Sequence, residues 1–260
     1  MEGLYAYHRY CVRHLKAKFQ RAYPNKYLHD VMWMAATDHQ ECKFRRRMEL
    51  IRQEDQGAYS WLMRHKLDKW TLHADGGRRW GILTINVSES FNGLVKFACG
   101  LHATVMVRMS FKQMAERFAE RYRVASSLME RGVEFIPIPM KIFDKYRKQA
   151  QWHSFLQYCN EQNIFEVRIA IRHNRGNNTH TVNKGRRLCS CGKGSIYHMS
   201  CSHAMKCLQH TGFATTRFID KEYSVAPYLN TYSGQLQPEG AEHYWPPEPF
   251  KMVYNKYYVR

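Results

Sequence analysis

CSCGKGSIYHMSCSH, residues 189–203, is the stretch from which the rest of the chain can be interpreted. It places Cys189, Cys191, Cys201 and His203 in the spacing C-x-C-x9-C-x-H. Three thiolates and one imidazole complete a tetrahedral zinc shell with no position left open, which is typical of a structural site and not of a catalytic one. We therefore expect these four residues to bind one structural Zn²⁺.

The residues around the four ligands predict a short hairpin followed by a helix. Cys189 and Cys191 lie two apart, so their side chains would share one face of a strand. Two glycines directly afterwards allow the chain to reverse. Cys201 and His203 lead into a predicted helix, whose amino-terminal amides favour the metal-binding thiolate form. Cys207 lies four residues beyond His203 on the same helical face and could compete for the metal.

Composition predicts a folded and strongly basic protein. The chain has 260 residues, of which 44% are hydrophobic and 14% aromatic, enough for one or two domains with a sizeable core. Its net charge of +18 favours a polyanionic partner, with nucleic acid first and anionic membrane second. Charge alone fits a generally basic soluble protein equally well, but a zinc finger in the same chain favours DNA.

The sequence gives no sign of a membrane or secretory protein. No apolar run approaches the ~20 residues that cross a bilayer, and the first residues lack the apolar region of a signal peptide. We therefore expect no membrane partner and a reducing compartment, where metal binding is favoured over disulfides. The alternative is that the cysteines are buried apolar side chains, but four of the eight fall within Cys189–Cys207 beside histidines.

Hydrophobic periodicity predicts an α+β chain that is mainly α. Residues 1–70 and 104–131 have helical patterns, while Pro137 and Pro139 are interpreted as a linker before a helix at 141–158. Two alternating stretches then predict strands ahead of the finger. These patterns divide the chain into a helical region (1–135), a linker helix and β segment (136–180), the zinc finger (181–214) and a tail rich in Tyr, Pro and Trp (215–260).

Two patterns outside the finger could also carry chemistry. Cys11 and His14 would share one helix face and could form a secondary metal motif, although packing and surface roles fit them as well. Glu89 lies in Asn86-x-x-Glu89-x-x-Asn92, which places three polar side chains on one side of a predicted helix. One carboxylate does not make a two-metal site for phosphoryl transfer, so a capping or surface role is the simpler interpretation of Glu89.

The spacing of the finger resembles that of the SWIM-type zinc finger, whose pattern is C-x-C, a variable gap and C-x-H. The order of the other motifs is similar to that in plant Mutator-like transposases, from about His8 to Pro247. The SWIM spacing is specific by itself, whereas the other motifs are specific only in this order. The shared motifs are HRYCVRHL, NVSESFNGLVK, a long helix, CSCGKG, CSHAMKC, APYLNTYSGQLQP and YWP.

The resemblance implies a fold and a set of residue roles. Family members cut and join DNA with two aspartates and a glutamate on an RNase H-like core, which carries a helical insertion before the glutamate. Glu89 would match that glutamate, Cys11 and His14 the CxxH motif after the second aspartate, and residues 15–85 the insertion. Only seven residues precede the HRYC motif, so both catalytic aspartates and their strands are expected to be missing.

What the resemblance implies is a transposase-derived nuclear protein that binds zinc and DNA and has no catalysis of its own. Two alternatives remain open. The chain could act in a DDE transposase whose aspartates are supplied upstream or by another chain. The finger could instead bind a protein in place of DNA, although the sequence predicts no particular protein partner.

Overall fold

The computed structural model describes residues 7–84, 102–159, 161, 163–170, 178–234 and 236–238, together with the single residues 93, 96 and 240. Within this part the protein is α+β and mainly helical, with one four-stranded antiparallel sheet. None of the helices in the described ranges is both long and apolar enough to cross a membrane.

The first part of the chain forms a block of helices. Asn25 caps the second helix by accepting a hydrogen bond from the backbone N–H of Tyr27, and Asp55 caps the fourth in the same way from Ala58. Such caps satisfy amides that have no partner within the helix. The elements of this helical block are α1 (Val12–Ala22), α2 (Lys26–Thr37), α3 (Glu41–Glu54), α4 (Gln56–Met63) and the 3-10 turn η1 (Leu67–Lys69).

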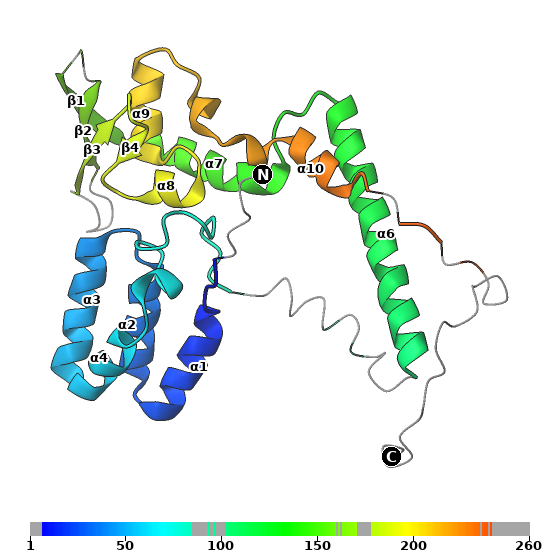
Figure 1. Cartoon of the computed structure of the whole chain (residues 1–260). Coiled ribbons are helices and arrows are strands. Elements are labelled where there is room, and N and C mark those ends of the chain that lie inside the picture. The colour runs from blue at the N-terminus through cyan, green and yellow to red at the C-terminus, as the bar shows by residue number, and fades with distance from the viewer. Residues whose placement is uncertain are drawn as a thin grey trace.

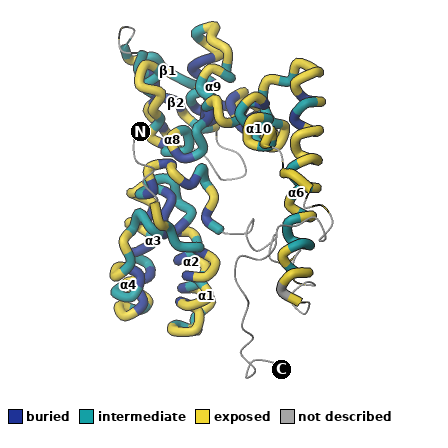
Figure 2. The backbone as a smooth tube through the Cα atoms, turned by 45° about the vertical axis from the view of Figure 1, so that its right-hand side comes forward, coloured by how far each residue is buried: buried dark blue, intermediate teal, exposed yellow. Residues whose placement is uncertain are grey.

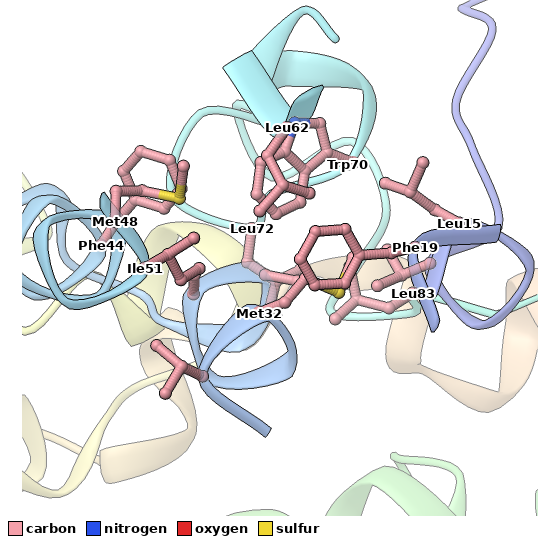
Figure 3. Packing of buried hydrophobic residues seen from close by; sticks show 14 of the residues in the cluster. Leu15, Phe19, Met32, Phe44, Met48, Ile51, Leu62, Trp70, Leu72 and Leu83 are labelled. Carbon is pink, nitrogen blue, oxygen red and sulfur yellow. The ribbon is translucent and has the colours of Figure 1, made fainter. Parts of the chain in front are cut away.

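One apolar core fills the space between these helices. Phe19 of α1, Met32 of α2 and Trp70 after η1 are fully buried within it. Figure 3 shows that Leu72 and Leu83 join the same cluster, so the chain that follows η1 is part of the core. Burying a large apolar side chain stabilises a fold by about 1.5–3 kcal/mol, so the helical block has its own source of stability.

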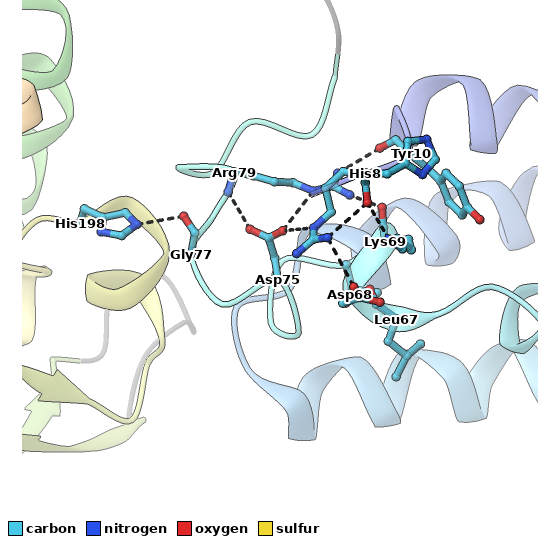
Figure 4. Close-up of polar contacts among 11 residues, drawn as sticks. His8, Tyr10, Leu67, Asp68, Lys69, Asp75, Gly77, Arg79 and His198 are labelled. Atoms are coloured by element: carbon cyan, nitrogen blue, oxygen red, sulfur yellow. Dashed lines mark hydrogen bonds and ion pairs between the residues drawn. The ribbon is translucent and has the colours of Figure 1, made fainter. Parts of the chain in front are cut away.

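A buried carboxylate fixes the segment after η1. Asp75 accepts hydrogen bonds from Nε of Arg9 (2.8 Å) and from the backbone N–H of Arg79 (2.7 Å), and Nε of Arg79 lies 3.3 Å from it. The Arg79 guanidinium also donates to the carbonyl oxygens of Tyr10 (3.1 Å) and Lys69. As Figure 4 shows, these contacts tie the start of the chain to the segment that continues toward His198 of the finger.

The long helix α6 (Ala103–Glu130) lies beside the rest of the molecule and packs on α10 (Val225–Tyr232). Among its described side chains only Ala125 and Leu128 are buried, and Figure 2 shows exposed and half-buried residues along the rest of it. Most of α6 therefore takes little part in the cores of the other elements (Figure 1).

The predicted linker at the two prolines is wrong. Pro137 and Pro139 lie in the first turn of α7 (Pro137–Ala150), where a missing N–H costs no helical hydrogen bond. The predicted helix at 141–158 also ends too late, because α7 stops at Ala150 and His153–Cys159 is strand β1. Side chains along β1 alternate between more and less exposed positions, the period of a strand.

The sheet has the order β1-β2-β3-β4, with all neighbours antiparallel. Helix α9 (Ser202–His210) covers one face, where Phe165, Val167, Val182 and Cys207 form an apolar cluster. The hairpin predicted to carry the first ligands forms the edge of a four-stranded sheet, so it is continuous with the β segment that precedes it. The remaining elements are β2 (Ile164–Ile169), β3 (Thr179–Asn183), β4 (Leu188–Cys189), α8 (Lys193–Tyr197), η3 (Thr215–Phe218) and η4 (Lys221–Tyr223).

The helical block contacts the finger through His198. This ring places Nε2 2.9 Å from the carbonyl oxygen of Gly77 and Nδ1 2.8 Å from the carboxylate of Asp220, and it stacks on Trp80 with centroids 3.9 Å apart. Gly77 has a φ of +78°, and a Cβ there would lie 2.3 Å from the carbonyl oxygen of Ser195. Only glycine allows the two backbones to come this close.

Substituting Gly77 with alanine is expected to destabilise the protein because it adds a clash with the finger backbone to an unfavourable φ. Gly132→Ala is the matched control, since Gly132 has a φ of +68° but open space around it. The control should cost about 1–2 kcal/mol, and Gly77→Ala about 1–3 kcal/mol more. Urea unfolding measures both, and equal destabilisation of the two variants would show that the close approach does not matter.

Candidate metal centre

The structure brings Cys189, Cys191, Cys201 and His203 together. Cys189 ends β4, Cys191 follows in the turn, Cys201 is the N-cap of α9 and His203 lies in the first turn of that helix. Their four potential ligand atoms all lie within 4.8 Å of one another. Cys189 is half-buried and the other three are buried, so an ion held among them would be largely shielded from water.

The distances between the donor atoms fit a tetrahedral ion. Nδ1 of His203 lies 3.6 Å from Sγ of Cys189 and 3.8 Å from Sγ of Cys201. In a zinc site with normal Zn–S and Zn–N bond lengths, donor atoms are about 3.5–3.8 Å apart. All three cysteines are free thiols, so none is withdrawn from the site by a disulfide. The cluster could therefore hold one metal ion, and its donors suit zinc.

Local backbone geometry explains how the cluster closes. Gly192 turns the chain after Cys191 with a φ of +73°, and a Cβ there would lie 2.3 Å from the carbonyl oxygen of His39. Cys201 accepts a hydrogen bond at Sγ from the backbone N–H of Ala204, at 3.5 Å. Because the amino terminus of a helix carries a partial positive charge, it stabilises the thiolate that a metal requires.

The three sulfurs share their protons unevenly. Hydrogen bonds from Cys189 and Cys201 lower the pKa of Cys191, whereas hydrogen bonding to Cys191 raises the pKa of Cys189. Hydrogen bonds from its two neighbours therefore stabilise the thiolate of Cys191. A metal ion has to displace the remaining protons, so affinity for the metal falls as the pH falls.

Cys207 does not join the cluster. Its thiol is fully buried beside Phe165, Val167 and Val182 of the sheet, and burial raises its pKa to about 12. The competition that its position along α9 suggested is not seen in the structure, which gives Cys207 the role of a small apolar side chain.

The other predicted site residues lie apart from this centre. Cys11 is the half-buried N-cap of α1, and His14 is an exposed residue in the first turn of that helix. The described residues hold no second group of three or more His, Cys, Asp or Glu side chains placed as ligands, so no third ligand joins this pair there. Glu89 lies outside the described residues.

Two histidines that the motif did not reveal flank the candidate ligand His203. The rings of His153 in β1 and His180 in β3 lie 5.0 and 4.3 Å from the ring of His203, measured between centroids. Burial lowers the pKa of both, that of His153 to about 4, so both imidazoles are neutral at neutral pH. His153 is held by Ser202, with Nε2 and Oγ 3.0 Å apart. The sequence contained one signal for this role of His180. It lies two residues before Val182 in a strand, so both side chains share the inward face.

Fold and site together define an α+β protein with a potential metal centre of three cysteines and one histidine, an arrangement compatible with a zinc finger. No protein-family model matches the chain, and neither a curated protein nor a solved structure is significantly similar to it. The resemblance to Mutator-like transposases and to the SWIM finger therefore stays a prediction from the sequence motifs.

Proposed function

We propose that this is a zinc-dependent DNA-binding protein of the nucleus, derived from a Mutator-like transposase and without catalysis of its own. The observation that carries the proposal is the convergence of three cysteines and one histidine, whose potential ligand atoms lie within 4.8 Å of one another. Zinc would act structurally here, because four protein donors leave no position open for a substrate.

A basic and aromatic surface on the finger supports DNA as the partner. Lys184 lies over the ring of Phe213 at 4.5 Å, Arg217 lies over the same ring at 4.6 Å, and Arg187 lies over Phe218 at 5.0 Å. We call these five residues the finger patch. Cation–π contacts of this length hold the cations in place while leaving their N–H groups free for phosphate oxygens.

The finger patch depends on the metal centre for its shape. Lys184 and Arg187 belong to the turn between β3 and β4, and β4 ends at the ligand Cys189. Arg217 lies in η3, beyond the end of α9. A metal that joins β4 to α9 would therefore fix the spacing of the three cations. The net charge of +18 adds a long-range attraction to any polyanion.

Removing the three cations of the finger patch is expected to weaken DNA binding and its salt dependence. The triple substitution of Lys184, Arg187 and Arg217 with alanine should reduce the slope of log K against log salt by about 1 for each phosphate that the variant no longer binds. Fluorescence anisotropy between about 50 and 200 mM salt measures this slope. The expected decrease in affinity is the same for unrelated DNA sequences, since phosphate contacts carry no sequence information.

A matched control removes the same charge elsewhere. Lys18, Arg21 and Lys26 are exposed residues of α1 and α2 at the end of the helical block that lies away from the finger (Figure 1). Replacing these three with alanine should change the slope much less. Equal effects of the two triple variants would argue against the finger patch, and affinity that does not depend on salt would refute the proposed phosphate binding.

A further inference from the structure

A cavity of about 490 Å³ lies where the helical block, α7, the sheet and the finger meet. Its wall contains side chains from the α2–α3 turn, from the end of α7, from β2 and β3, and from the finger. Small-molecule sites are typically about 300–1,000 Å³, so a nucleotide-sized group fits. The cavity borders the metal ligands Cys191 and His203, but no part of the proposed function uses it.

The charges on the cavity wall favour an anion. Lys43 and Lys193 contribute two ammonium groups. The one carboxylate of the wall, Asp38, already forms an ion pair with Arg47, with Oδ2 and Nε 3.5 Å apart. The amino terminus of α9 adds a partial positive charge at Ser202. A ligand that brings a phosphate group would therefore be attracted to this cavity.

Two ring nitrogens of the wall have no hydrogen-bond partner in the described part of the chain. They are Nδ1 of His153 and Nε2 of His203, on side chains that are 8% and 4% exposed. A buried polar nitrogen without a partner destabilises a fold by an amount comparable to a lost hydrogen bond. The ring of His203 would be held by the metal, but a small shift of the His153 ring would present its free nitrogen to a ligand with polar edges, such as a nucleobase.

An exposed tryptophan lines the cavity. Trp152 is 55% exposed, and it also lines a second hollow on the surface of α7. That hollow contains Lys141, Lys145 and Lys148, which recur at helical spacing on one face of α7. The hollow also contains Asp144, which forms an ion pair with Arg147 at 2.9 Å, so cations still predominate along the surface from α7, past an aromatic ring, to the cavity.

We propose that this cavity accepts one unpaired nucleotide of a DNA strand. The base stacks on Trp152 as it enters, and the flanking phosphates contact the three lysines of α7 on one side and Lys43 and Lys193 on the other. A cationic track with an aromatic platform is the arrangement that binds single strands, and a base already unpaired is the least costly to draw out of a duplex. This inference rests on the proposed DNA binding, and it specifies that DNA with an unpaired nucleotide is preferred.

The test uses the zinc-loaded full chain and three labelled duplexes of equal sequence. One is blunt and fully paired, one carries a single unpaired nucleotide, and one carries the same bulge without its base. Anisotropy titrations should show the bulged duplex bound about tenfold more tightly than the other two, as expected for one stacked base. Trp152→Ala should abolish this preference, because it removes the platform.

Further variants locate the effect. Ala170 lines the cavity, so Ala170→Trp narrows it without changing a charge; because the new ring could itself stack a base, Ala170→Leu is measured beside it, and both should abolish the preference. Tyr27→Ala removes an exposed aromatic ring of α2 and should leave the preference intact. Retained metal content shows that the finger of each variant has folded, and circular dichroism shows that the helical block has.

The outcomes separate this inference from the proposed function. If all three duplexes bind equally with a steep salt dependence, or if Trp152→Ala and Ala170→Trp keep the preference, the nucleotide cavity is refuted and DNA binding stands. If no duplex binds, the proposed function itself is refuted and the cavity with it.

Discussion

Replacing Cys201 with serine is expected to release the metal and to unfold the sheet and finger together. Sγ of Cys201 is both a candidate ligand and the cap of α9, and its residue is fully buried. Helix α9 packs on α7 and on the sheet, so unfolding it removes the apolar cover of both. Structural zinc contributes about 10–16 kcal/mol in finger peptides, as much as the whole stability of a typical domain, which is about 5–15 kcal/mol.

Hydrogen exchange and metal analysis on the same sample measure this effect. We expect protection to disappear in β1–β4 and α9 and to persist in α1–α4, because the helical block has its own core. Cys42→Ser, at an exposed position of α3, should change neither quantity. Cys207→Ser should lower stability through its buried position but keep the metal. Full metal content in the Cys201 variant would rule out the ligand role of this residue.

Replacing Asp75 with alanine is expected to be the most damaging change in the helical block. It removes the carboxylate shared by Arg9 and Arg79, whose side chains are only 14% and 6% exposed. Arg9 keeps its ion pair with Asp68 at 3.4 Å, but Arg79 loses its carboxylate, and leaving a buried charge without its partner typically costs about 3–5 kcal/mol. The same substitution frees the segment that presents Gly77 to His198, so it should also weaken the packing of the block against the finger.

Urea unfolding followed by circular dichroism measures the destabilisation. The control is Asp144→Ala, which removes an exposed ion pair with Arg147 at 2.9 Å on α7. Exposed pairs contribute about 0–1 kcal/mol, so the control should lie close to the unmodified protein. If the two variants are equally stable, Asp75 does not hold the block together in the way its contacts suggest.

Local patterns predicted most of the helices. The residues of α2 that recur at helical offsets, Leu28, Val31, Met32, Ala35 and Ala36, are all buried. The error at α7 and β1 arose because prolines were interpreted as a break, whereas the first helical turn tolerates them. The alternation in β1 follows directly after a helical pattern, and periodicity alone does not locate such a boundary.

The ligand group could be anticipated because Cys189, Cys191, Cys201 and His203 lie within a short stretch and their spacing is local information. The histidines stacked on His203 could not, since β1 and β3 reach it only through sheet pairing. The cavity beside them is likewise assembled from segments far apart in sequence. Asp75 and Arg9 are 66 residues apart in the sequence, so no local spacing pattern could predict their ion pair.

X-ray absorption spectroscopy at the zinc edge on the purified full chain determines which atoms surround the ion. We predict one zinc per chain with three sulfur neighbours at about 2.3 Å and one nitrogen at about 2.0–2.1 Å. A chain without bound zinc, or a shell of four sulfurs or mainly of oxygen, would contradict the assignment of Cys189, Cys191, Cys201 and His203 as its ligands.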